Sequence, residues 1–149
     1  MQPPRRSLRS APWSARAARA VTATKVGRTL AAYRPRANGL PDPGEVVWAF
    51  VAFEEDADRG KDRPVVVVGR AGRSSVYALM LTSQSRRAAD PQWVPLGAGP
   101  WDPLERPSWV RLDRVLWLPN RAMRREGAAL SPAVFASLRD RLRAGYGWV

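Results

Sequence analysis

Short apolar runs separated by polar, turn-rich segments fill the middle of the chain. The first run, residues 45–53, follows the turn formers of residues 41–44 and is rich in valine and aromatic side chains. Such runs, bounded by Gly, Pro and acidic residues, are typical of strands. The pattern predicts strands at residues 45–53, 65–68 and 76–82, a polar loop at 54–62 and a turn at 69–75.

The pattern is looser over the next part of the chain. Residues 83–108 carry several prolines and tryptophans without periodicity, so they are expected to form a long loop. Short strands are predicted at 109–112 and 115–118. An arginine cluster at residues 121–125 then precedes the last element and is expected to be a solvated face.

A helix is the clearest prediction of the pattern. Ser131 is placed to cap it, and Pro132 occupies the first helical position, where its missing N–H costs nothing. Apolar residues then recur at helical spacing, and Gly145 is expected to end the helix. The members of the apolar stripe are Val134, Phe135, Leu138 and Leu142. Short strands followed by one helix predict a mainly β fold with α additions, a small curled antiparallel barrel carrying a C-terminal helix.

Residues 1–40 differ from the rest, which divides the chain into two parts. They are rich in Arg, Ala, Pro and Ser and lack a periodic apolar pattern, so we expect a basic, disordered arm before a folded domain at residues 41–149. Residues 14–20 could form a helical turn or two. The arm could tether nucleic acid, could be an inert basic tail, or could precede a true start of translation at Val21.

The charge of the chain is concentrated in this arm. The whole sequence has 25 Lys and Arg against 13 Asp and Glu, a formal net charge of +12. Residues 1–41 hold nine of the basic residues and no acidic one, so the folded part is only mildly basic. A basic protein favours an anionic partner, either a nucleic acid or a membrane surface.

The absent residue types narrow the possible chemistry. The chain has no Cys and no His, which excludes disulfides, the usual zinc ligand sets and the commonest general base at neutral pH. Catalysis would have to use carboxylates, arginines and hydroxyls, and we expect no metal and no cofactor. Neither a membrane span nor a signal peptide is evident, so a cytoplasmic location is expected.

Four segments in a fixed order resemble the PemK/MazF family of toxins. Residues 43–48 (PGEVVW) are similar to the first strand of that family, and residues 63–67 (RPVVV) to its second. Residues 78–83 (ALMLTS) resemble the strand that ends in a Thr-Ser pair. Residues 108–115 (SWVRLDRV) are similar to a segment that carries an Arg-x-Asp pair in some members. Each motif alone is weak, and the four in order are fairly specific.

The resemblance implies an SH3-like β-barrel that dimerises, cleaves single-stranded RNA and is held inactive by an antitoxin, here expected to be a small acidic protein. It also implies that Arg63, Thr82, Arg111 and Asp113 lie together as catalytic residues. The chain departs from the pattern by its N-terminal arm and by a long Trp- and Pro-rich segment between Ser83 and Arg111.

These residues suit metal-free RNA cleavage, which needs a base, an acid and positive charge at the phosphate. Arg63 begins a strand after a loop, where it can present a guanidinium to phosphate, or form an ion pair with a nearby acid. Thr82 and Ser83 end a strand. Their hydroxyls can bind a phosphate or ribose, or only the nearby backbone.

Arg111 and Asp113 stand two apart, so on a strand they share a face. The spacing suits an acid–base pair and equally a salt bridge. Arg111 could supply a proton or only charge, and Asp113 could act as a base or only orient its neighbour. Ser83, Lys61 and Trp93 are the residues expected to bind RNA. Trp93, with Trp101 and Trp109, could stack on bases or fasten the long loop, whereas Trp48 is expected in the core.

The main hypothesis is therefore a metal-independent endoribonuclease toxin that cleaves messenger RNA. The alternative is a catalytically inactive SH3-like module that binds RNA or a protein. A DNA-binding protein is the least favoured, because the chain shows neither a helix-turn-helix nor a zinc pattern.

Overall fold

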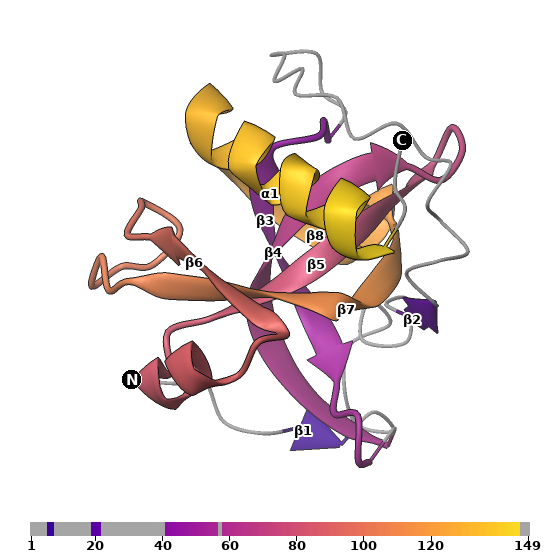
Figure 1. The fold of residues 1–149 in the computed structure, drawn as a ribbon. Coiled ribbons are helices and arrows are strands. Elements are labelled where there is room, and N and C mark those ends of the chain that lie inside the picture. Colours follow the sequence, from indigo (N-terminus) through magenta and orange to yellow (C-terminus); the bar gives the residue numbers. More distant parts are fainter. Residues whose placement is uncertain (1–5, 8–18, 22–40, 57, 147–149) are drawn as a thin grey trace.

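The computed structural model describes residues 6–7, 19–21, 41–56 and 58–146 (Figure 1). These residues form a curled sheet, two short 3-10 helices and one α-helix. The elements are β1 (Arg6–Ser7), β2 (Arg19–Val21), β3 (Glu45–Ala52), β4 (Arg59–Arg70), β5 (Ser75–Thr82), η3 (Ser85–Ala89), β6 (Trp93–Gly97), β7 (Ser108–Pro119), η4 (Asn120–Ala122), β8 (Met123–Ala129) and α1 (Pro132–Tyr146).

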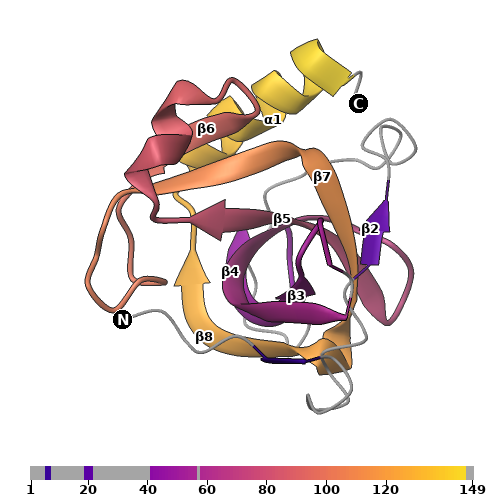
Figure 2. The same cartoon turned by 90° about the horizontal axis from the view of Figure 1, so that it is seen from below.

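All strand pairs of the sheet are antiparallel among the described residues. The strands follow the order β2-β7-β5-β4-β3-β8, and β1 pairs with β4 while β6 pairs with β7. Seen from below, the sheet curls around itself (Figure 2). The prediction of a mainly β, curled antiparallel fold with one C-terminal helix is confirmed.

The valine run of β4 explains why two apolar clusters form. Val66 and Val68 belong to one cluster, together with residues of α1, and Val65 and Val67 belong to the other. Successive residues of a strand point to opposite faces, and here both faces are buried. Helix α1 covers one side of the sheet (Figure 1), where Phe135 is 1% exposed.

The helix begins as predicted. Its first turn is capped by Ser131, whose Oγ accepts a hydrogen bond from the backbone N–H of Val134 at 3.2 Å. Phe135, Leu138 and Leu142 are buried. The helix continues to Tyr146, so Gly145 lies within its last turn and does not end it.

Strands β3 and β5 match their predicted ranges closely, but the predicted loop at 54–62 is too long. Strand β4 already begins at Arg59, and Lys61 pairs with Val51. Gly60 makes this pairing possible, because a Cβ there would overlap the carbonyl oxygen of Val51. The strand lacks an apolar pattern at this end, since its side chains line a polar pocket described below.

The expected loop at 83–108 was wrong in part. It contains η3 and β6, and β6 pairs with β7 through Trp93–Arg111 and Val94–Val110. Pro95 hid this strand from the pattern. A proline is compatible with it because, among the described residues, β6 pairs only with β7, and the register shifts between Pro95 and Gly97.

The two short strands predicted at 109–112 and 115–118 are one continuous strand, β7. It bends (Figure 2) and its pairing with β5 shifts in register between Leu79 and Leu81. The polar residues Asp113 and Arg114 interrupt the apolar pattern at this point. The arginines of the cluster at 121–125 are exposed, as expected for a solvated face. Residues 123–129, however, form β8, a strand that was not predicted and that pairs with β3.

Two short strands, β1 and β2, fall within residues 1–40 and pair with β4 and β7. The rest of this segment lies outside the described residues, as does most of the helical turn expected at residues 14–20. A disordered arm therefore stays a prediction.

Candidate functional site

One pocket of about 300 Å³ gathers most of the residues selected from the sequence. Strands β3, β4, β5, β6 and β7, the 3-10 helix η3 and the loop between β3 and β4 contribute to it. Of the seven expected site residues, six line this pocket, namely Lys61, Arg63, Thr82, Trp93, Arg111 and Asp113. Ser83 instead lines a neighbouring pocket of about 130 Å³, which shares Lys61, Arg63 and Thr82 with the first.

Arg111 is held by two carboxylates. Its Nε donates a hydrogen bond to Asp113 Oδ1 at 2.7 Å, and one of its terminal nitrogens donates to Asp113 Oδ2 at 3.3 Å. The same terminal nitrogen donates to Glu54 Oε2 at 2.7 Å. The expectation that Arg111 and Asp113 share a face of the strand is therefore confirmed, and their contact is an ion pair.

This environment favours the charged form of Arg111. The hydrogen bond to Asp113 raises the pKa of the Arg111 guanidinium, against the opposing effect of burial, and Glu54 adds to the rise. A guanidinium is already protonated throughout the physiological range. The geometry thus suits Arg111 as a fixed positive charge rather than as a proton donor.

A second arginine of β7, Arg114, lies in the same pocket. Burial lowers the pKa of its guanidinium, and the positive charge of Arg111 lowers it further. One of its terminal nitrogens donates to the carbonyl of Ala52 at 3.1 Å, which fixes the side chain against the end of β3. Arg114 still carries a full charge at neutral pH.

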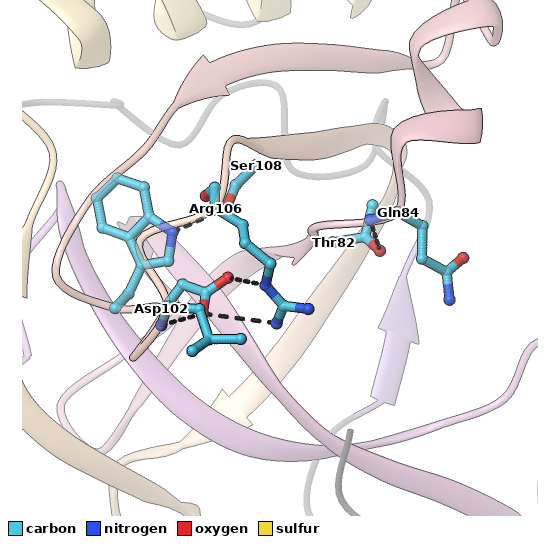
Figure 3. A network of polar contacts seen from close by, with 7 residues as sticks. Thr82, Gln84, Asp102, Arg106 and Ser108 are labelled. Carbon is cyan, nitrogen blue, oxygen red and sulfur yellow. Dashed lines mark hydrogen bonds and ion pairs between the residues drawn. The ribbon is translucent and has the colours of Figure 1, made fainter. Parts of the chain in front are cut away.

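Thr82 lies at the end of β5, where its hydroxyl has one proton to donate and lone pairs to accept. Its Oγ1 accepts the backbone N–H of Gln84 at 3.3 Å (Figure 3). This is the local turn bond expected for a strand end. The bond uses the oxygen as an acceptor, so a hydroxyl donor toward a phosphate is compatible with it.

Lys61 and Trp93 are both buried at the pocket wall, with exposed fractions of 8% and 6%. The guanidinium of Arg87 lies 4.9 Å from the centre of the Trp93 ring. This is a cation–π contact. A base could stack on that ring face only if Arg87 moved away, and stacking by Trp93 stays a prediction.

The other tryptophans have different surroundings. Trp48 is only half-buried and lines the smaller pocket, so its expected place in the core was wrong. Arg124 lies 5.8 Å from its ring. Trp101 is buried, and its Nε1–H donates to Ser108 Oγ at 3.0 Å, so this residue fastens the long loop to β7.

Several residues of the larger pocket escaped the sequence analysis. They are Glu54, Glu55, Gln84, Arg86, Arg87, Asp90, Gln92 and Arg114. Only Arg114 carried a usable signal, since it follows Asp113 directly. The others lie in segments whose position depends on the unpredicted strand β6 and on the curl of the sheet.

Positive charge prevails in this pocket. Six basic side chains line it against four acidic ones (Glu54, Glu55, Asp90 and Asp113). A concave surface with an excess of one sign attracts ligands of the other sign, here an anion such as phosphate. Among the described residues, no group of three or more acidic residues is placed to hold a metal ion.

The fold and this cationic pocket define a small β protein suited to an anionic ligand. A match to a known protein family defines the class of protein more closely. The family described as the PemK-like, MazF-like toxin of type II toxin-antitoxin systems matches residues 42–145. The chain belongs to this family. Such a system pairs each toxin with an antitoxin, so an antitoxin partner is implied.

No curated protein matches the chain. In the part of the chain that the structure describes, helices are too short or too polar to cross a membrane.

Proposed function

We propose that the chain is a metal-independent endoribonuclease toxin that cleaves single-stranded RNA, with messenger RNA as its target. The observation that carries this proposal is the convergence of Arg63, Thr82, Arg111 and Asp113 on one cationic pocket in a chain of the toxin family. These residue types supply positive charge, a hydroxyl donor and a carboxylate, which RNA cleavage can use without a metal ion.

The chemistry assigned to the pocket is attack of a ribose 2′-hydroxyl on the adjacent phosphate: an O2′–P bond forms as the P–O5′ bond breaks, which leaves a 2′,3′-cyclic phosphate. Solvent water takes the 2′-hydroxyl proton and delivers a proton to the leaving 5′-oxygen. Arg111 and Arg63 stabilise the negative charge that develops on the phosphate oxygens. Thr82 donates its hydroxyl proton in a hydrogen bond to the same phosphate. Asp113 orients Arg111, because both of its carboxylate oxygens accept from that guanidinium.

The partners of the proposed toxin follow from its charge and family. A small acidic antitoxin would neutralise the basic pocket, and the protein would act in the cytoplasm as a homodimer. Within the chain, the carboxylate of Glu54 already forms an ion pair with Arg111, as an acidic side chain of the antitoxin would.

Incubation of a long single-stranded RNA with purified protein in EDTA tests the proposal. We expect discrete fragments from the wild type, and a loss of about 10²–10³-fold in cleavage rate for Arg63→Ala, as for removal of one donor from an anion-stabilising site. Circular dichroism and thermal melting would show that the variant is folded. Intact RNA with the wild-type protein would contradict the proposal.

A second candidate is a catalytically inactive module that binds RNA or a protein. The ion pairs of Arg111 favour this candidate, because two carboxylates contact its guanidinium. In an inactive module, the ion pair with Glu54 would serve only to hold the β3–β4 loop against β7. RNA that binds to the protein and stays uncut would support this module.

A further inference from the structure

The smaller pocket adjoins the candidate active site. It measures about 130 Å³, which is the space of about four water molecules at roughly 30 Å³ each. That space suits one flat group of the size of a nucleobase. Lys61, Arg63 and Thr82 line both pockets, so a chain bound with its phosphate in the larger pocket could place a neighbouring group in the smaller one.

The Trp- and Pro-rich segment before β7 forms one wall of this pocket. Trp101, Pro103 and Ser108 line it, and the Trp101–Ser108 hydrogen bond fixes the wall. Gly99 allows the fold of this segment, because a Cβ there would overlap the Trp101 ring. Opposite elements contribute Trp48 and Pro64, so ring-shaped side chains come from both β3–β4 and the loop.

The polar part of the pocket centres on a fixed arginine. Arg106 Nε donates to Asp102 Oδ2 at 2.8 Å, and one terminal nitrogen lies 3.5 Å from Asp102 Oδ1 (Figure 3). Asp102 is 6% exposed and also accepts the N–H of Leu104 at 2.9 Å. Although burial alone would raise it, the hydrogen bonds from Arg106 and Leu104 lower the pKa of Asp102, so the carboxylate stays charged.

The Arg106 side chain nevertheless remains 43% exposed. A guanidinium has five N–H donors in a rigid fork, and the contacts with Asp102 use one N–H from each of two nitrogens. In the part of the chain that the structure describes, no other contact uses the remaining donors, so a ligand can accept from them. Asp62, on the same pocket, adds a carboxylate acceptor whose ion pair with Arg124 is long, at 3.5 Å.

We propose that this pocket binds one guanine base of the RNA next to the cleaved phosphate, with Arg106 as the residue that selects it. The inference rests on the proposed function for its substrate. Single-stranded RNA is read through bases that stack on aromatic side chains and form hydrogen bonds along their edges. Trp48 supplies the aromatic surface through the part of its ring that Arg124, 5.8 Å from the ring centre, leaves open. Asp102 is a positioning residue that holds Arg106.

Guanine fits the charges better than the other bases. It offers two adjacent acceptors, O6 and N7, to an arginine fork, and this is the commonest specific arginine–base contact. Adenine presents one acceptor and one donor on the same edge, so one guanidinium N–H would face another donor. Guanine also carries N–H donors on its other edge, which a carboxylate such as Asp62 can accept.

Binding of short 2′-fluoro RNA tests this proposal, because the absence of 2′-hydroxyls prevents cleavage. Two uridine oligomers would be compared by fluorescence anisotropy, one with a single central guanine and one with adenine. The wild type should bind the guanine oligomer about tenfold more tightly. Arg106→Ala and Asp102→Asn should reduce this preference below about twofold, and Arg106→Lys should not restore it, because lysine lacks the planar fork.

Arg141→Ala is the matched control, since Arg141 is exposed on α1 and lines neither pocket. It should keep the preference. Equal binding of both oligomers by the wild type, or a guanine preference that survives in folded Arg106→Ala, would overturn the proposal. Cleavage by the wild type separates the two proposals. RNA cut without regard to guanine would support the nuclease and contradict the guanine pocket. A guanine preference without cleavage would support the pocket and contradict the nuclease.

Discussion

Arg111 and Asp113 lie two residues apart on β7, and their side chains form a two-point ion pair in which Arg111 Nε donates to Asp113 Oδ1 at 2.7 Å. The pair is only partly buried, with side chains 18% and 32% exposed. A surface ion pair of this kind contributes little to stability, about 0–1 kcal/mol. The main effect of the ion pair is therefore to orient the Arg111 guanidinium in the pocket and to favour its charged form, rather than to stabilise the fold.

This geometry predicts different results for two substitutions of Asp113. Asp113→Asn keeps an oxygen that can accept from Arg111, so RNA cleavage should fall by about tenfold or less. Asp113→Ala removes both contacts and should cost at least about a hundredfold. If Asp113 were instead a general base, both variants would lose a similar factor of about 10²–10⁴. Single-turnover cleavage rates measure the difference, and equal losses would contradict an orienting role.

Glu54 leads to a prediction of opposite sign. Its carboxylate contacts Arg111 at 2.7 Å although its side chain is 60% exposed, so an RNA phosphate must compete with it. Glu54→Gln should therefore bind single-stranded RNA several-fold more tightly, with a smaller gain at high salt because exposed charges are screened. Binding of uncleavable RNA at two salt concentrations measures this. Glu126→Gln, exposed and outside the pocket, is the control, and equal gains in both variants would show that only net charge matters.

The sequence predicted the fold where burial imposes a simple pattern. The valine run of β4 and the stripe of α1 are apolar because both are largely buried, so a strand and a helix were recognised there, although β4 extends beyond residues 65–68 and α1 continues past Gly145. Strands β6 and β8 were missed for the opposite reason. Among the described residues, β6 pairs only with β7 and β8 only with β3, so both are edge strands, where the apolar pattern weakens. Pro95 lies on β6, and the exposed Arg124 and Arg125 lie on β8.

The candidate site was predicted by family resemblance more than by residue pattern. Arg63 and Arg111 are far apart in sequence, and the strand order brings them to one pocket, because β4 and β7 both pair with β5. The Arg111–Asp113 contact was within reach, because the two-residue spacing of a strand fixes a common face. The contact with Glu54 was not, since it joins residues 57 positions apart through a loop.

Gly60 provides a test of the β3–β4 hairpin that supports the pocket. A Cβ at this position would overlap the carbonyl oxygen of Val51 and approach Ala52 Cα and Phe50 Cε1 to 2.8 Å each. The paired strands cannot separate to relieve this without loss of their hydrogen bonds. Gly60→Ala should lower the free energy of unfolding by about 1–3 kcal/mol, as for overpacking. Urea denaturation measures it.

Gly145→Ala is the control for this prediction. Gly145 lies in the last turn of α1, and a Cβ there would meet nothing within 4 Å. Alanine is favoured over glycine in a helix, so this variant should be stabilised by up to about 0.5–1 kcal/mol. Destabilisation of both variants by the same amount would show that the close approach at Gly60 is not the cause.

The ion pair of Asp102 predicts how stability depends on pH. Hydrogen bonds from Arg106 and Leu104, opposed by burial, lower the pKa of Asp102 in the folded state below that of the unfolded chain. A carboxylate with a lowered pKa stabilises the fold above its unfolded pKa, about 3.9, and loses this contribution as the pH falls through the folded pKa.

The stability difference between wild type and Asp102→Asn should thus be constant from pH 7 to about pH 5 and shrink below about pH 4. Arg106→Ala should show the same loss of advantage at low pH, because its guanidinium is one cause of the shift. Urea denaturation at pH 7, 5 and 3 measures both differences, and a gap between wild type and Asp102→Asn that stays the same size down to pH 3 would contradict this account.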